Sequence, residues 1–580
     1  MRRMNLRPCF RRTIALSLVL ALTAVTLGQR RPQPTTSETK RPRLVLLIVV
    51  DQFRYDYLER FGDLFAPNGL RRLLQQGASW TQSNYDHTPT YTAPGHATMM
   101  TGAYPAETGI VGNEWPDRSV GKRVTSVSDP SVQLLGGKGT GSSPHRLLGS
   151  TLGDELRLAT GDRSKVIGIS IKDRSAILPS GRHANAAYWE NNGNFVSSTY
   201  YFNDLPSWVV SFNNAKQADQ YFGKKWERLL PESEYLERAG PDSPAWEKIG
   251  AAPGDTNAFP HTITGGLTAP GPAFYTQLDH SPFVNELLLS FAKQTITNEQ
   301  LGADSYTDVL TVSFSGNDYV GHRYGPYSQE VMDVTLRIDR QIGELLDFVN
   351  TKVGLANTLV AFTADHGVAP IPEHAWALKL DGGRINVTEL VKKMRAAISA
   401  KYNPQTKTPD PTDDYIYKYK DENGILRDAF YNSNLYFNYD ALRRDGVNVA
   451  EIAEVAGQAA LTFPGIARYF TRAQLLRGAT SPDDPIERRV LHGFNPTRSG
   501  DLILIAEPYK FMGDLLPTTH GTPYSYDTNV PTIIMGAGVI AGRYLEPASP
   551  ADIAPTLSAL LRVTKPSNTT GRVLIEAIKK

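Results

Sequence analysis

The chain has 580 residues, of which 41% are hydrophobic, so it is long enough for one large domain with insertions or for two to four smaller domains. Its 61 Lys and Arg residues nearly balance 59 Asp and Glu residues, which leaves a formal net charge of +2. This balance gives no basic field that would indicate nucleic-acid binding and no acidic tail that would indicate a cationic partner. Any recognition of an anion must therefore be local.

Residues 1–28 have the pattern of a secretory signal peptide. Five Arg residues precede an apolar run over about 14–27, and the small residue Gly28 follows. The run is short for a transmembrane helix, although a retained membrane anchor is the alternative. Residues 29–40, rich in Pro, Thr, Ser and Arg, predict a flexible leader. We expect an exported protein, periplasmic or secreted, with no stable membrane insertion after the signal is cleaved.

The only cysteine, Cys9, precedes the apolar run and would leave with the signal peptide. The mature chain would then have no thiol, no disulfide and no cysteine metal ligand. This composition suits an exported protein that binds metals through carboxylate and imidazole groups.

Four apolar stretches are each followed by Asp or His residues. Unbroken apolar runs predict strands that are buried on both faces of a parallel sheet, and ligands of such sheets bind beyond the carboxyl ends of the strands. We therefore expect all four segments to deliver their polar residues to one sheet edge. They are Leu44–Val50 with Asp51, 309–315 with Asp318 and His322, Thr358–Thr363 with Asp365 and His366, and Leu502–Ala506 with His520 after a loop.

Helical patterns alternate with these strands. Apolar residues recur at spacings of three and four after Ser328, which is a candidate N-cap, and residues 151–158 predict a helix that leads into a strand over 165–171. Alternating strands and helices predict an α/β fold with a doubly wound, mostly parallel central sheet and helices on both faces.

Two regions have the character of insertions into a core made of 41–372 and 500–580. Residues 188–280 are rich in aromatic residues, Pro, Gly and Asn without a sustained period, and predict a cap or lid over the site. Residues 373–499 predict a small α+β subdomain with helices over 390–401 and Val449–Leu461. No fixed-period repeat is present, which argues against a solenoid or a propeller.

Thr92, in the run from Tyr91 to His96, is the candidate nucleophile. A threonine hydroxyl is a weak nucleophile unless a base or a divalent metal activates it. Three Asp and three His residues suit two divalent ions about 4 Å apart that hold the attacking and leaving oxygens of a phosphoryl transfer. Mixed carboxylate and imidazole ligands favour Zn²⁺ over Mg²⁺ or Ca²⁺, with Mn²⁺ and Co²⁺ left open.

The motifs resemble those of the alkaline phosphatase superfamily. Gln follows Asp51, Gly-Asn-Asp-x-x-x-His surrounds Asp318, and Thr-His-Gly surrounds His520. The closest resemblance is to secreted, zinc-dependent, phosphate-irrepressible monoesterases, which are similar in core fold to nucleotide pyrophosphatase/phosphodiesterases, and it extends over about 44–574. It implies an alkaline phosphatase-like fold and two zinc sites. One site would use Asp318, His322 and His520, and the other would use Asp51, Asp365, His366 and the nucleophile Thr92.

The resemblance also implies that Asn113, Lys172 and Arg174 bind phosphoryl oxygens. A monoester carries extra negative charge on its non-bridging oxygens, which a Lys and the planar fork of an Arg can bind, whereas a diester replaces one of these oxygens with an organic group. Phosphodiesterase relatives generally lack this cationic pair. Without the resemblance, the Lys-Asp-Arg run would be interpreted as a solvated turn.

We therefore expect an alkaline phosphatase that hydrolyses small phosphate monoesters through a phosphothreonine intermediate at a two-zinc site and acts as a monomer. The alternatives are a phosphodiesterase or nucleotide pyrophosphatase of the same superfamily and, from another class, a non-catalytic exported protein that binds zinc or phosphate. A cysteine-type sulfatase is excluded because Cys9 is the sole cysteine. The export signal argues against a cofactor-independent phosphoglycerate mutase, which also normally uses a Ser nucleophile.

Overall fold

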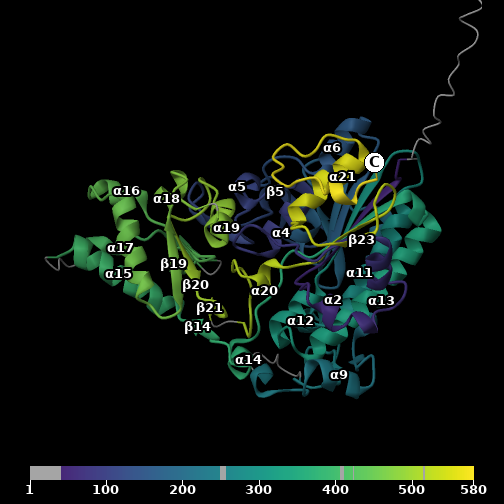
Figure 1. The fold of residues 1–580 in the computed structure, drawn as a ribbon, viewed down its shortest axis with the longest axis horizontal. Helices are drawn as coiled ribbons and strands as arrows, with labels where there is room; N and C mark the ends of the chain where they lie inside the picture. Colours follow the sequence, from purple (N-terminus) through teal and green to yellow (C-terminus); the bar gives the residue numbers. More distant parts are fainter. Residues whose placement is uncertain are drawn as a thin grey trace, which may run out of the picture. The chain divides into compact units, whose positions relative to one another are not determined.

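The computed structural model describes residues 41–248, 256–404, 410–421, 424–481, 483–513 and 516–579 (Figure 1). The expected signal peptide and leader lie outside these ranges. Within them, no helix is both long enough and apolar enough to cross a membrane.

The central feature is an eleven-stranded sheet. Its five middle strands, β13, β1, β12, β7 and β8, are parallel, and antiparallel pairs flank them on both sides. This arrangement confirms the predicted α/β fold with a mostly parallel sheet. In sheet order the strands are β23 (Gly542–Tyr544), β2 (Ala78–Trp80), β22 (Thr532–Met535), β13 (Thr358–Thr363), β1 (Leu44–Val50), β12 (Asp308–Phe314), β7 (Val166–Ser170), β8 (Ala186–Asn191), β9 (Asn194–Ser198), β5 (Ser128–Leu135) and β6 (Thr140–Ser142).

Helices cover both faces of this sheet, as predicted. Alternate residues of β1 enter two different apolar clusters, because successive side chains of a strand point to opposite faces. One cluster contains side chains of α11 (Phe283–Asn298) and α13 (Gln329–Lys352). The other contains side chains of α4 (Thr92–Thr101), α6 (Leu152–Thr160) and α21 (Ile553–Leu561) (Figure 1). An unbroken apolar run such as β1 is therefore required by burial on two sides.

The helix starts follow local hydrogen bonding. The Oγ of Ser328 accepts a hydrogen bond from the N–H of Val331 at 3.1 Å, which confirms the predicted N-cap of α13. Thr151 and Asp154 form a capping box at the start of α6, which ends at the left-handed residue Gly161.

Most of the segment 373–513 forms a separate α+β layer. Its four-stranded sheet has the order β17-β18-β20-β19, and α15 and α17 contribute to the apolar cluster on one of its faces. The elements of this segment include β14 (Gly383–Ile385), α15 (Val387–Tyr402), β15 (Lys418–Lys420), β16 (Leu426–Asp428), β17 (Phe430–Tyr431), β18 (Asn434–Leu435), α16 (Tyr439–Arg444), α17 (Val449–Leu461), β19 (Ile466–Thr471), α18 (Arg472–Leu476), α19 (Pro485–Gly493), β20 (Leu502–Ala506) and β21 (Lys510–Met512).

Strand β20 differs from the expectation that it would end at the edge of the central sheet. It pairs with β18 and β19 instead. Leu502 and Leu504 face the cluster formed with α15 and α17, while Ile503 and Ile505 enter a second cluster on the other side. Because both faces of β20 are covered, its sequence has the same unbroken apolar character as a strand of the central sheet.

The region expected as a cap, 188–280, begins within the central sheet, in β8 and β9. The part that follows contains α8 (Ser207–Asn214), β10 (Lys225–Trp226), α9 (Glu232–Ala239), β11 (His261–Thr262) and α10 (Pro272–Asp279). Trp226, Tyr235 and Phe274 are buried in the same cluster as α11 and α13, with α9 in contact with α13 and α10 in contact with α11. Buried aromatic side chains therefore attach this region to the core.

Candidate metal and catalytic site

Three parallel strands bring acidic residues to one edge of the sheet. Asp51 follows β1, and its N–H donates a 2.9 Å hydrogen bond to the carbonyl oxygen of Phe314 at the end of β12. Asp318 lies two residues into α12 (Gly316–Tyr324), which begins directly beyond β12, and Asp365 follows β13. His520 comes from a loop that lies far away in the sequence. The predicted convergence of these segments is present, although β20 is not one of the strands that produce it.

Two groups of side chains can each hold a metal ion. Within the described residues, the ligand atoms of each group lie within 4.8 Å of one another. One group is Asp318, His322 and His520, the same three residues that the resemblance assigned to one zinc site. The other is Asp51, Asp318 and His366, so Asp318 belongs to both groups. Asp365, which was expected in the second set, has its Oδ2 3.4 Å from the Nε2 of His366.

The three histidines are all held in the tautomer that metals bind. Each Nδ1 lies at hydrogen-bond distance from a backbone carbonyl, and because a carbonyl can only accept, Nδ1 carries the proton and the Nε2 lone pair remains for a metal. The three bonds are His322 to Thr518 O at 2.9 Å, His366 to Gly367 O at 3.0 Å and His520 to Thr90 O at 2.7 Å. Burial, followed by the neighbouring His366 and His322, lowers the pKa of His520 well below its usual value, which favours the neutral ring.

The charges of the site also fit metal ions. Asp51 and Asp365 are fully buried and Asp318 is 3% exposed, and the ammonium group of Lys172 lies 2.7 Å from Asp51 Oδ2 and 2.5 Å from Asp318 Oδ2. Burial and the neighbouring carboxylates raise the pKa of Asp51, whose Oδ1 has no hydrogen-bond partner among the described residues. One ammonium does not balance three buried carboxylates. Together with three imidazole nitrogens, they form a donor set suited to divalent cations.

Thr92 is the first residue of α4, and its side chain is 1% exposed. Its Oγ1 lies 3.5 Å from the Nε2 of His366. A helix N-terminus favours negative charge, so this position supports an alkoxide. Gly95 allows the helix to lie against the end of β13, because a Cβ at this position would be 2.3 Å from the carbonyl oxygen of Asp365. The structure thus places the predicted nucleophile among the predicted ligands.

Two of the three predicted phosphoryl-binding residues, Asn113 and Lys172, contact the same centre, and Arg174 lies two residues beyond Lys172. The Oδ1 of Asn113 accepts a 2.8 Å hydrogen bond from the N–H of Ala93, which leaves its amino group available as a donor. Lys172 and Arg174 flank the start of the short helix α7 (Asp173–Ile177). Burial alone would lower the pKa of Lys172, but Asp318 and Asp51 raise it, so it stays charged. The Nε of Arg174 is buried without a hydrogen-bond partner among the described residues.

Two further residues complete the site without having been assigned a role from the sequence. Gln52 donates its backbone N–H to Asp365 Oδ1 at 3.0 Å and its side-chain amide to Asp318 Oδ1 at 2.6 Å. Its backbone is left-handed, with a φ of 63°, which is unusual for a residue with a side chain. His96 lies 2.9 Å from the Thr92 carbonyl and 3.3 Å from Asp365 Oδ2. The sequence signal for Gln52 was its position directly after Asp51, and the signal for His96 was its position four residues after Thr92, one helical turn away.

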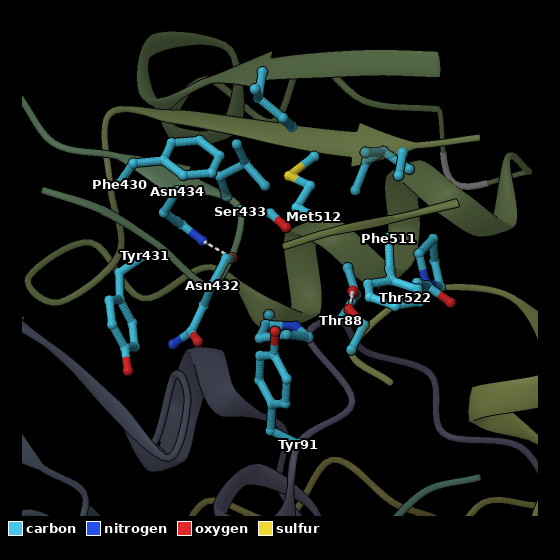
Figure 2. Close-up of a pocket in the computed structure, with 18 of the residues that line it drawn as sticks. Thr88, Tyr91, Phe430, Tyr431, Asn432, Ser433, Asn434, Phe511, Met512 and Thr522 are labelled. Carbon is cyan, nitrogen blue, oxygen red and sulfur yellow. Dashed lines mark hydrogen bonds between the residues drawn. The ribbon is translucent and has the colours of Figure 1, made fainter. Parts of the chain in front are cut away.

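A cavity of about 390 Å³ adjoins the site between the core and the segment 373–513. On the core side it is lined by Thr88, Tyr91 and His520, and on the other side by the hairpin of β17 and β18 and by β21 (Figure 2). None of its lining residues within the described ranges comes from 188–280. The prediction that 188–280 forms a lid over the site stays a prediction.

Comparisons with known proteins agree with this architecture. Residues 45–523 match the family model described as type I phosphodiesterase / nucleotide pyrophosphatase. The chain is 35% identical to alkaline phosphatase PafA of Elizabethkingia meningoseptica, covering 94% of this chain and 96% of that protein. It is also 35% identical, with the same coverage, to a protein of Myroides odoratus named calcium-transporting ATPase. A crystal structure of wild-type PafA matches with a TM-score of 0.84 and 34% identity over 93% of this chain and 99% of that chain.

Fold, motifs and relatives thus confirm the resemblance to the alkaline phosphatase superfamily. The chain belongs to the type I phosphodiesterase / nucleotide pyrophosphatase family.

Proposed function

We propose that this chain is an alkaline phosphatase that hydrolyses phosphate monoesters at a two-zinc site, with Thr92 as the nucleophile. The observation that carries the proposal is the convergence of Thr92, two groups of Asp and His ligands and a buried lysine at one sheet edge. The likeness to PafA over nearly the whole chain supports the same activity. The N-terminal pattern further supports export, and we retain the prediction of a monomer.

The chain contains ligands for two metal ions. Asp318, His322 and His520 would hold one zinc, and Asp51, Asp365 and His366 the other, with Asp318 close enough to contribute to both. When bound, zinc ions supply positive charge that stabilises alkoxide oxygens and lowers the pKa of water.

The chemistry of the chain itself is a double displacement. Thr92 loses its proton, its Oγ1 forms a bond to phosphorus, and the bond from phosphorus to the organic oxygen breaks, which releases an alcohol after protonation. Water then attacks phosphorus, and the bond to Thr92 breaks, which yields inorganic phosphate and restores the hydroxyl after protonation. The amide of Asn113 and the cations Lys172 and Arg174 would hold the non-bridging oxygens through both steps.

A phosphodiesterase is the second candidate, and the matching family model favours it by its description. Both activities can use the same nucleophile and metals. The distinction rests on Lys172 and Arg174, because a second organic group on the phosphate removes one of the charged oxygens that this pair would bind.

The test compares p-nitrophenyl phosphate with bis-p-nitrophenyl phosphate at alkaline pH, with and without added zinc. We expect a large, zinc-dependent preference for the monoester. The matched variant Thr92→Ala should retain bound zinc but lose most turnover on both substrates. A preference for the diester would select the second candidate, and unchanged hydrolysis by Thr92→Ala would remove Thr92 from the mechanism.

A further inference from the structure

The cavity of about 390 Å³ adjoins the proposed reaction centre. Its lining includes Tyr91, which directly precedes the nucleophile, and His520. His520, Asp318 and His322 together form one of the two candidate metal sites. The rings of Tyr91 and His520 lie 5.4 Å apart, edge to face. Thr92 directly follows Tyr91, and the ring of His520 stacks on that of His366 with centroids 3.4 Å apart. One end of the cavity therefore lies next to the nucleophile and to a candidate metal ligand, where the organic group of a bound ester would extend into it.

Aromatic and aliphatic side chains make up about half of the described lining of the cavity, and most of its polar side chains are uncharged. Tyr91, Phe430, Tyr431, Phe511 and Met512 contribute to it, and none of the lining residues within the described ranges is Asp, Glu or Arg. Figure 2 shows Tyr91 and Met512 on opposite sides of the open space.

Among the described lining residues there is one lysine, Lys510, and it is already paired. Lys510 Nζ lies 3.0 Å from Asp381 Oδ2 and 3.4 Å from Glu507 Oε2. The charge of Lys510 is therefore balanced by two carboxylates of the protein. An anionic group of a ligand in the cavity would have to compete with them for this lysine.

The wall formed by the β17–β18 hairpin is held in place before any ligand binds. Asn432 and Ser433 at its tip are both left-handed, with φ values of 50° and 62°. The side-chain amide of Asn432 donates to the Glu114 carbonyl of the core at 2.8 Å, and that of Asn434 donates to the Asn432 carbonyl at 2.7 Å (Figure 2). These bonds fix a conformation that residues with side chains seldom adopt. A cavity with such a wall is largely pre-formed.

We propose that this cavity binds the organic group of the phosphate monoester and selects uncharged, ring-bearing leaving groups over small or charged ones. The inference rests on the proposed function and names the substrate class for the same site. A volume of about 390 Å³ lies in the range of about 300–1,000 Å³ that is usual for small-molecule pockets. Burial of a ring against its apolar side chains would be favourable, and a carboxylate there would lose hydration without meeting an unpaired cation among the described lining residues.

The test uses substrates whose alcohols have similar intrinsic reactivity. We compare kcat/KM for ethyl phosphate, 2-phenylethyl phosphate and 2-(4-carboxyphenyl)ethyl phosphate. The phenyl compound should be preferred over the ethyl compound by about tenfold or more, since one methylene in an apolar pocket already gives about tenfold. The carboxylate should remove most of that preference. Equal values for the ethyl and phenylethyl esters would overturn the inference while leaving the proposed function intact, and failure to hydrolyse p-nitrophenyl phosphate would overturn both.

A variant locates the preference in this cavity. Met512→Asp places a carboxylate in the lining. It should bring the ratio of kcat/KM for 2-phenylethyl phosphate to kcat/KM for ethyl phosphate toward one. Repulsion between the new carboxylate and the phosphate group affects both substrates alike and does not change this ratio. Leu476→Asp is the matched control, because Leu476 lines a different cavity of about 420 Å³ that contains no residue of the site. It should leave the ratio unchanged. If Met512→Asp does not fold, Met512→Ala should lower the ratio. An unaltered ratio in a folded Met512 variant would overturn the assignment.

Discussion

The sheet edge and the segment 373–513 contribute differently to the site. The edge supplies charged groups whose positions are fixed by fully buried strands, with Asp51 and Asp365 at 0% exposure. The segment 373–513 supplies short strands and a hairpin whose described side chains around the cavity are buried or half-buried and, apart from the paired Lys510, carry no charge. The comparison indicates that the reaction chemistry depends on the core, while the choice of leaving group depends on the insertion.

The largest effect that we expect is on activity, when the two cationic residues of the core, Lys172 and Arg174, are replaced. The double variant Lys172→Ala, Arg174→Ala should lower kcat/KM for p-nitrophenyl phosphate by at least about 100-fold, because hydrogen bonds to charged groups contribute about 1.5–3 kcal/mol each. Hydrolysis of bis-p-nitrophenyl phosphate should fall far less. Steady-state kinetics on both substrates measures the difference. Equal losses would mean that the pair supports the site without distinguishing monoesters from diesters.

Gln52 tests how strongly the core depends on its supporting residues. Gln52→Asn keeps a residue that tolerates a left-handed backbone but shortens the side chain, so that it no longer reaches Asp318. We expect a loss of about 10–100-fold in zinc affinity or activity, as is typical when a partner of a metal ligand is removed. Competition with a zinc chelator and steady-state kinetics measure the two losses.

The matched control for this variant is Gln341→Asn, which makes the same change on α13, away from the ligands. It should leave both zinc affinity and activity near those of the unaltered protein. Unchanged zinc affinity and activity in Gln52→Asn would show that the backbone hydrogen bond to Asp365 suffices to position the site.

The same division explains what could be predicted from the sequence. Unbroken apolar runs such as β1 and β13 are distinctive, and the Asp that follows each run marks the sheet edge. Strand β20 carries the same pattern because its two faces are also covered, so nothing local distinguishes its small sheet from the central one. Gln52 and the hairpin at Asn432 act through hydrogen bonds to residues distant in the sequence, which periodicity does not reveal.

Asn432 joins the two regions directly. Its amide bonds to the carbonyl of Glu114, beside Asn113, and Gly112 leaves room for it, since a Cβ there would be 2.2 Å from that amide nitrogen. Asn432→Gly removes this hydrogen bond, and glycine tolerates the left-handed backbone at this position. The variant should lower kcat/KM for the monoester by about fivefold, which corresponds to the free energy of one neutral hydrogen bond. Ser433→Gly changes the same turn without removing the bond. Equal kinetics in the two variants would contradict a link through Asn432.

The smallest expected effect concerns stability where α19 meets the core. Arg488 Nε lies 2.8 Å from Asp86 Oδ2, and His492 Nδ1 lies 2.7 Å from the Asp86 carbonyl oxygen. Burial alone would raise the pKa of Asp86, but hydrogen bonds from His492 and Arg488 lower it to about 2. Because the group is partly exposed, water screens the pair, and Asp86→Asn should destabilise the protein by only about 1 kcal/mol or less near pH 6.

The sign of the pH dependence follows from the lowered pKa of Asp86. The ionised carboxylate stabilises the fold at pH values above its unfolded value of 3.8, and this contribution is lost as the pH falls toward 2. Burial alone would lower the pKa of His492, but Asp86 raises it above 6.5, so the comparison is made below that pH. Thermal unfolding of the unaltered protein and of Asp86→Asn, from pH 6 downward, should therefore show a difference that is constant between about pH 6 and pH 5 and shrinks below pH 4. A difference that grew on acidification would assign the stabilisation to another group, and α19 would then be attached to the core by its apolar contacts rather than by Asp86.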